Sequence, residues 1–139
     1  AGGGQVIGVI PEELRMRELA HNGVTELRVV KTMHERKATM EELSDAFIAL
    51  PGGFGTLEEF SEIATWALLG IHAKACGLLN IDGFYDGLLT FLDHAVAEGF
   101  IHRQQRSVIV SASDVDRMFD TILQTPVPSF QQWVRREHT

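Results

Sequence analysis

A glycine-rich turn is the segment of this sequence best suited to hold a ligand. It runs from Pro51 to Glu59 (PGGFGTLEE), after an apolar strand-like run and before an amphipathic stretch. Glycines let a backbone approach a ligand closely, and the N–H groups and dipole of a helix N-terminus attract phosphate. The spacing matches neither the Walker pattern nor GxGxxG. Two interpretations remain: a phosphate- or carboxylate-binding loop, or a tight structural turn.

Within this turn, Thr56 and Glu59 have two possible roles. The spacing Thr-x-x-Glu at a helix start predicts a capping box, in which each side chain satisfies a backbone N–H group. A carboxylate beside a glycine-rich loop is also a candidate catalytic group. Both roles stay open, since one does not exclude the other. As a first-turn residue, Glu59 is expected to have its ionised form favoured, which suits charge stabilisation better than proton donation.

A second segment places cations near a predicted helix start. The run from His34 to Lys37 (HERK) follows a strand-like stretch, and Thr32 and Glu35 have the spacing of another capping box. Arg36 and Lys37 flank the apolar stripe of this helix, close to an end whose dipole disfavours positive charge. They either bind an anion or extend into solvent.

Other kinds of chemistry find little support. The six histidines show no metal-ligand spacing, so no metal site is expected. His34 is not followed by a histidine four residues later, and the others are expected at the surface: His21, His72, His94, His102 and His138. The single cysteine, Cys76, lies in a strand pattern, and no Gly-x-Ser-x-Gly motif occurs, which disfavours nucleophilic catalysis.

Alternating strands and helices must position these groups. Five apolar runs predict strands, at 5–10, 27–31, 45–50, 75–80 and 107–110. Four amphipathic stretches predict helices, at 33–43, 56–69, 86–98 and 114–123, with Gly99 as a stop signal. Continuously apolar strands that alternate with helices predict an α/β fold, a parallel sheet with helices on both faces.

Length and charge narrow the function further. The 139 residues suit one domain, here predicted over 1–125 with a tail at 126–139. Lys and Arg number 12 against 19 Asp and Glu, and a formal charge of -7 makes nucleic acid a poor partner. No apolar run reaches the ~18 residues of a membrane span, and no secretion signal opens the chain. A lone cysteine fits the reducing cytoplasm, where we expect the protein.

The two motifs together resemble the LOG ("Lonely Guy") family, the cytokinin riboside 5'-monophosphate phosphoribohydrolases. The family signature is Pro-Gly-Gly-x-Gly-Thr-x-x-Glu downstream of His-x-Arg-Lys, which here are 51–59 and 34–37. Shorter pieces resemble the family in the same order: 9–11, 17–19, 44–50, 65–66 and 83–86. The resemblance extends over about residues 3–124. Members were often labelled lysine decarboxylases, a label for which this sequence gives no chemical reason.

The resemblance implies hydrolysis of the N-glycosidic bond of adenosine 5'-monophosphate (AMP), often N6-substituted, to free base and ribose 5-phosphate. It implies a Rossmann-like sheet, no metal or organic cofactor, and a homodimer or larger assembly with the site near the subunit interface. Arg36 and Glu59 correspond to the catalytic pair. The remaining correspondences are a phosphate cradle of Gly52, Gly53, Gly55 and Thr56, and substrate contacts at Glu18, Lys37 and Thr65.

Two departures from the family are visible. The family usually begins with a further strand, helix and strand that carry a glycine-rich segment, so a Rossmann-like sheet without this N-terminal unit is expected. The family often has Lys-Pro where this chain has Lys74-Ala75, away from every predicted site residue. The alternative function is a non-catalytic nucleotide-binding carrier or sensor on the same fold. The presence of both Arg36 and Glu59 favours the enzyme.

Overall fold

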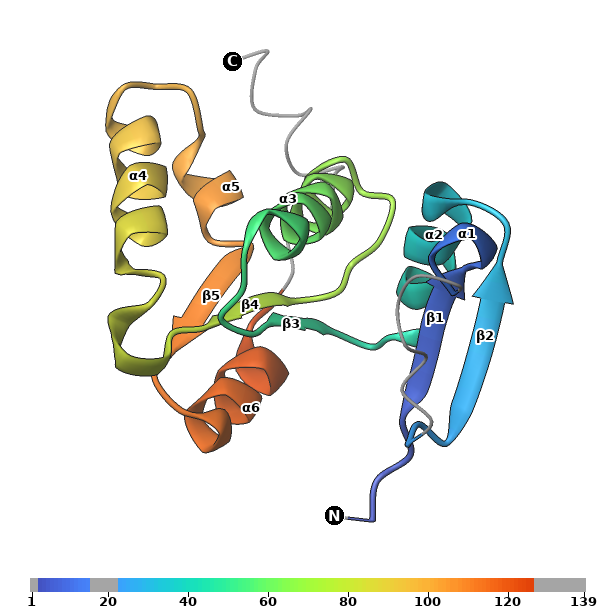
Figure 1. The fold of residues 1–139 in the computed structure, drawn as a ribbon. Helices are drawn as coiled ribbons and strands as arrows, with labels where there is room; N and C mark the ends of the chain where they lie inside the picture. Colours follow the sequence, from blue (N-terminus) through green and yellow to red (C-terminus); the bar gives the residue numbers. More distant parts are fainter. Residues whose placement is uncertain (1–2, 16–22, 127–139) are drawn as a thin grey trace. The chain divides into compact units, whose positions relative to one another are not determined.

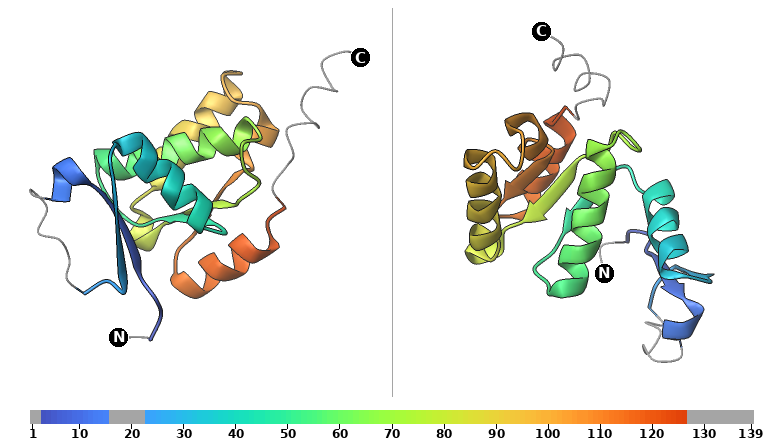
Figure 2. Two further views of the ribbon diagram at one scale, coloured as in Figure 1. Left: turned by 90° about the vertical axis from the view of Figure 1, so that its right-hand side faces the viewer. Right: turned by 90° about the horizontal axis from the view of Figure 1, so that it is seen from above.

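Parallel strands alternate with helices throughout the described part of the chain (Figures 1 and 2). The structure is a computed structural model that describes residues 3–15 and 23–126. The chain divides into two compact units, Ala1–Ser44 and Asp45–Thr139. The predicted α/β class with parallel strands is confirmed. The predicted limits of a single domain, 1–125, stay a prediction.

The first unit is a pair of parallel strands with two helices. β1 (Ile7–Pro11) pairs with β2 (Glu26–Val30), and Ile7 lies opposite Glu26. The four-residue helix α1 (Glu12–Arg15) follows β1 directly. Helix α2 (Met33–Leu43) follows β2 and contacts both strands. The sequence predicts two strands followed by a helix here, and the structure adds α1 between the strands.

Helix α2 has the predicted bounds and the predicted N-cap. The hydroxyl oxygen of Thr32 accepts the backbone N–H of Glu35 at 3.0 Å. The carboxylate of Glu35 turns back one residue further than in a capping box and accepts the N–H of Lys31 at 2.7 Å. These two bonds fix the first turn, so Arg36 and Lys37 lie in the second turn of α2.

The second unit is a parallel sheet in the order β3–β4–β5. Its strands are β3 (Phe47–Ala49), β4 (Cys76–Leu79) and β5 (Ile109–Ala112). Its helices are α3 (Phe54–Leu68), the 3-10 helix η1 (Ile81–Gly83), α4 (Asp86–Ala97), α5 (Arg103–Arg106) and α6 (Val115–Gln124). Figures 1 and 2 show α3 and α6 on opposite faces of this sheet.

Strand β4 is buried on both of its faces. Successive side chains of a strand point to opposite faces, and the two sets enter different hydrophobic clusters. Cys76 and Leu78 pack with side chains of α3, among them Phe60 and Ile63. Leu79 packs with Met118 of α6 on the other face. This double burial explains the continuously apolar sequence of β4, which period-2 alternation does not describe.

The structure corrects the predicted start of α3. The sequence predicts that this helix begins at Thr56, whereas it begins at Phe54 with Gly53 as its N-cap. The capping box of Thr56 and Glu59 is therefore wrong, because Glu59 lies in the second turn of the helix. Helices α1 and α5 and η1 were not predicted, since three or four residues carry no periodicity. No helix in the described residues is long and apolar enough to cross a membrane.

We predict that the native protein resists thiol reagents. Cys76 has no exposed surface, and burial raises the pKa of its thiol to about 12. At pH 8 roughly one thiol in 10⁴ is then the reactive thiolate. A disulfide reagent should label Cys76 at the rate of unfolding, and quickly in denaturant. Labelling in native buffer at the rate of a free thiol would contradict the described packing of β4.

Candidate active site

The glycine-rich segment forms the junction between β3 and α3, where the sequence predicts it. Leu50 and Pro51 follow β3, Gly53 is the N-cap, and the N–H of Leu57 donates to the carbonyl of Gly53 at 3.1 Å. The first N–H groups of an α-helix have no acceptor within the helix. Those of the first turn of α3 therefore face the loop, at the carboxyl end of a parallel strand, where open α/β sheets bind ligands.

The three glycines of the loop differ in what surrounds them. A Cβ atom added at Gly52 would lie 2.8 Å from Cβ and 3.2 Å from Cγ2 of Thr56, so packing requires glycine there. A Cβ atom at Gly53 or Gly55 would meet no atom within 4 Å among the described residues. Neither of the two has a positive φ, the other common reason for glycine. Close approach of a ligand to the backbone is a remaining reason for glycine at Gly53 and Gly55.

Thr56 and Glu59 lie on one side of α3. They are three residues apart, a spacing that places two side chains on the same helix face. The Thr56 side chain packs over Gly52, and both Thr56 and Glu59 are half-buried. The structure therefore brings the carboxylate of Glu59 within one helical turn of the loop. Glu59 lies in the second turn of α3 and not in the predicted first turn, because the helix begins two residues early.

Thr65 does not share that side of the helix. It follows Glu59 by six residues, which is about 240° around the axis and about 9 Å along it. Its side chain is exposed, and its hydroxyl donates to the carbonyl of Ser61 at 2.7 Å. Its predicted role as a substrate contact stays a prediction. Glu18, the other predicted contact outside the two motifs, lies outside the described residues.

Arg36 and Lys37 belong to the first unit of the chain, and both are half-buried on α2. None of the residues of α2, all of which are described, is buried. Met33 and Leu43, the apolar residues at its two ends, are 41% and 40% exposed. The two cations are thus less exposed than the apolar ends of their own helix. The loop and Glu59 belong to the second unit. Of the predicted catalytic pair, Arg36 therefore lies in the first unit and Glu59 in the second.

One residue that the sequence did not single out contacts the residue that immediately precedes the loop. Tyr85, only 2% exposed, donates its hydroxyl to the carbonyl oxygen of Leu50, the residue before Pro51, at 2.5 Å. Asn80, at the end of β4, accepts the N–H of Tyr85 at 2.6 Å. The resemblance contains Tyr85 within the piece 83–86, which is the one signal in the sequence that pointed to it.

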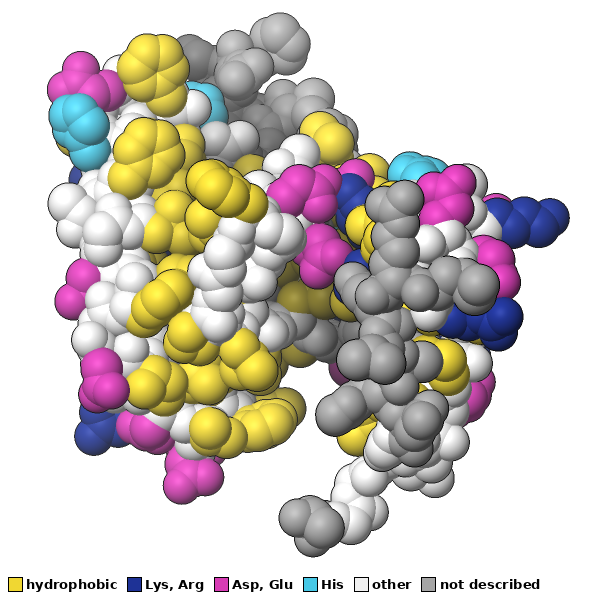
Figure 3. Space-filling view, viewed as in Figure 1, with side chains coloured by type: hydrophobic (Ala, Val, Ile, Leu, Met, Phe, Trp, Pro, Cys, Tyr) yellow, Lys and Arg dark blue, Asp and Glu magenta, His cyan; other side chains and the backbone are white. Residues whose placement is uncertain are grey.

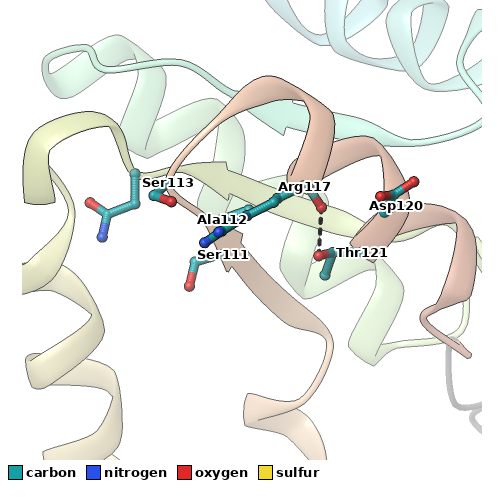
Figure 4. A pocket seen from close by; sticks show the side chains of 7 residues that line it. Ser111, Ala112, Ser113, Arg117, Asp120 and Thr121 are labelled. Atoms are coloured by element: carbon teal, nitrogen blue, oxygen red, sulfur yellow. Dashed lines mark hydrogen bonds between the residues drawn. The ribbon is translucent and has the colours of Figure 1, made fainter.

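A polar pocket of about 420 Å³ opens at the carboxyl ends of β4 and β5 (Figure 4). Its lining combines residues at and after the strand ends with residues of α6: Asn80, Ser111, Ala112, Ser113, Arg117, Asp120 and Thr121. The described residues that line it include none of the predicted site residues. Arg117 at its rim is exposed and forms an ion pair with Asp114 at 3.4 Å.

The structure corrects the expectation for one histidine. His72 was expected at the surface but is 7% exposed, with Nε2 3.0 Å from the carbonyl oxygen of Ile63. Its Nδ1 accepts the N–H of Lys74 at 3.2 Å, so both ring nitrogens are satisfied inside the core. His34, His94 and His102 are exposed. Within the described ranges, no three His, Cys, Asp or Glu side chains gather as metal ligands would.

Comparison with known proteins decides the family. A family model described as "possible lysine decarboxylase" matches residues 1–122. The cytokinin riboside 5'-monophosphate phosphoribohydrolase LOG2 of Arabidopsis thaliana is 50% identical over 135 residues, 97% of this chain and 63% of its own length. The rice enzyme LOG is 60% identical over 111 residues, 80% of this chain and 46% of its own. The chain belongs to the LOG family.

The LOG relatives are longer than this chain, which spans about half to two-thirds of their length. Arabidopsis LOG4, 60% identical over 111 residues, is matched over 52% of its length. The phosphoribohydrolase name of these relatives agrees with the resemblance noted in the sequence, whereas the family model keeps the decarboxylase description. Family membership accounts for the glycine-rich loop and for the His-x-Arg-Lys motif together.

We predict opposite stability effects for two glycine substitutions in the loop of this LOG protein. Gly52→Ala should lower the free energy of unfolding by about 1–3 kcal/mol, because the new methyl group overlaps Thr56. Gly55→Ala should be neutral or stabilising by up to about 1 kcal/mol, because it has open space in a helix. Urea denaturation measures both values. Equal destabilisation by the two variants would contradict the described loop.

Proposed function

We propose that this protein hydrolyses the N-glycosidic bond of AMP or an N6-substituted AMP, releasing the free base and ribose 5-phosphate. The observation that carries the proposal is the open space at Gly53 and Gly55, beside the N-terminus of α3 and one helical turn from Glu59. A phosphate at the helix start would place the attached ribose near that carboxylate. The names of the LOG relatives support the same substrate class.

The groups of the site suit this chemistry. Cleavage of an N-glycosidic bond develops positive charge on the ribose ring, which a nearby carboxylate stabilises. In the proposed reaction a water molecule adds to the anomeric carbon, the bond to the base nitrogen breaks, and a proton goes to the departing base. Glu59 serves as the charge partner, as an acceptor for a ribose hydroxyl, or as the base for water. The reaction consumes only the nucleotide and water.

Arg36 and Lys37 of α2 are the proposed cationic contacts of the substrate. Arg36 presents a planar guanidinium that binds phosphate or two ribose oxygens in a fixed geometry. Lys37 adds positive charge on the same helix, and Glu18 and Thr65 are further proposed contacts. Binding energy from the remote phosphate would hold the scissile bond in position against Glu59.

Product analysis tests the proposal directly. The protein is incubated with AMP and with an N6-substituted AMP, and free base and ribose 5-phosphate are measured by chromatography. Gly55→Ala should lose most of the activity, because its methyl group occupies the space proposed for phosphate. Gly87→Ala is the matched control: Gly87 also stands second in its helix, α4, with no described atom within 4 Å of an added Cβ. Binding of AMP without cleavage would favour the carrier or sensor instead.

The substitution Glu59→Gln tests the carboxylate. It keeps the size of the side chain and removes the charge, so we expect kcat to fall by about 10²–10³-fold with little change in nucleotide binding or melting temperature. Glu58→Gln changes the exposed neighbour of Glu59 and should have nearly wild-type activity. Nearly wild-type turnover in Glu59→Gln would refute the catalytic assignment.

The substitution Arg36→Ala tests recognition of phosphate. If Arg36 and the glycine loop bind the 5'-phosphate, wild-type protein should prefer AMP over adenosine by ~10⁴-fold, since a site built for a group rejects an analogue without it. Arg36→Ala should lower kcat/KM for AMP by about 10²-fold or more and change the low value for adenosine little. Arg28→Ala removes a surface arginine of the same unit, one paired with Glu26 at 2.7 Å, and serves as the control. Equal wild-type rates on AMP and adenosine would contradict the phosphate cradle.

We also propose that the protein forms a homodimer or larger assembly through α3 and α4. Large side chains stay exposed on and beside these helices, among them Phe91 at 62%, Phe100 at 86% and Phe54 at 93%. Figure 3 shows hydrophobic side chains gathered on the face of the unit that carries α4. An isologous contact through such a surface would remove them from water.

Light scattering with two matched variants tests this assembly. Phe91→Glu should shift the protein toward the monomer at micromolar concentration. Phe119→Glu, which changes a phenylalanine 54% exposed on α6, should leave the mass unchanged. A wild-type monomer with full activity would refute the proposed assembly.

A further inference from the structure

Tyr85 links the core of the second unit to the entry of the glycine-rich loop. Its ring belongs to the buried cluster that contains Phe60 and Ile63 of α3 and Ala49 of β3. Its hydroxyl leaves that cluster and donates to the carbonyl oxygen of Leu50 at 2.5 Å. Leu50 is the last residue before Pro51, and its own side chain is 60% exposed. The entry of the loop is therefore held to the core by a hydrogen bond to the backbone of Leu50, and not by packing of the Leu50 side chain.

A polar network fixes where Tyr85 lies. The side-chain oxygen of Asn80 accepts the N–H of Tyr85 at 2.6 Å, and its side-chain nitrogen donates to Asp86 at 2.7 Å. The backbone N–H of Asn80 donates to the carbonyl of Ala112, at the end of β5, at 2.8 Å. The hydrogen bonds thus run from the end of β5, through the end of β4, to the end of β3.

The turn between Asn80 and Tyr85 is built for this connection. Asp82 has a φ of 50°, rare for a residue other than glycine, and Gly83 has a φ of 73°. A Cβ atom at Gly83 would lie 3.2 Å from Cγ of Asp86, the partner of Asn80. Two consecutive left-handed residues reverse the chain within η1 and return it to the strand ends, where Tyr85 begins α4 as its N-cap.

We propose that Tyr85 is a positioning residue for the phosphate-binding loop: its hydrogen bond to Leu50 holds Pro51–Gly53 and the start of α3 in the geometry that receives phosphate. The inference rests on the function proposed above and adds a residue to it. The ring alone would be enough for core packing. The hydroxyl adds a hydrogen bond to Leu50, which lies between the end of β3 and Gly52, the first residue of the proposed cradle.

The phenol of Tyr85 is a donor at neutral pH, as tyrosine ordinarily is. Desolvation raises its pKa further above that range. A hydroxyl lost by mutation leaves the Leu50 carbonyl without its described side-chain donor. The loop then opens more often, although the hydrophobic cluster around the ring stays packed.

The variant Tyr85→Phe, compared with Ile122→Val, tests the proposal. Ile122→Val removes one methyl group from the cluster on the other face of β4, far in sequence from the loop, and serves as a control for general loss of stability. In Tyr85→Phe we expect hydrogen exchange at the amide of Leu57, which donates to the carbonyl of Gly53, to rise about tenfold. We expect the Kd for ribose 5-phosphate to rise by a similar factor, with a higher KM for AMP and a smaller change in kcat. Ile122→Val should change none of these.

The readouts separate the inference from the function on which it rests. If wild-type protein neither binds ribose 5-phosphate nor cleaves AMP, the proposed function is wrong, and exchange at the Leu57 amide still shows whether Tyr85 orders the loop. Equal exchange, Kd and KM in wild type and Tyr85→Phe would overturn the positioning role. Equal changes in Tyr85→Phe and Ile122→Val would also overturn it, because they would reflect stability alone.

Discussion

Burial of β4 on both faces is the constraint from which the second unit follows. A central parallel strand must be apolar at every position, and β4 meets this with Cys76 and Leu78 on the α3 face and Leu79 on the α6 face. Each face needs a covering helix, so β3 and β5 must each lead into one. The carboxyl ends of the three strands consequently meet at one edge, where the glycine-rich loop begins.

At that edge, the residues that pack the loop in place differ from the residues that border the space proposed for the ligand. Thr56 and Gly52 pack against each other, and Tyr85 holds the backbone before them. Gly53 and Gly55 take no part in this packing and border open space. An anion site needs a fixed loop and an unobstructed helix N-terminus, because the backbone N–H donors are then oriented before the ligand binds.

Much of this arrangement could be predicted from the sequence, and the reasons are physical. The bounds of α2 follow from the Thr32 cap, and Gly99 ends α4 with a φ of 81°, as its position predicts. The start of α3 was placed two residues late because Thr-x-x-Glu is also a capping signal, and local spacing does not reveal which residue becomes the N-cap. The buried His72 bonds to Ile63, 9 positions away, and Tyr85 bonds to Leu50, 35 positions away. No local sequence pattern encodes contacts between residues so far apart.

The account depends on an anion binding at the start of α3, and chemical-shift mapping tests this most directly. Isotope-labelled protein is titrated with ribose 5-phosphate while the backbone amide signals are followed. The account predicts saturable shifts that are largest at residues 53–56, including Gly53 and Gly55. Saturable shifts confined to the pocket at Ser113 and Arg117, or no saturable shift at residues 53–56, would contradict it.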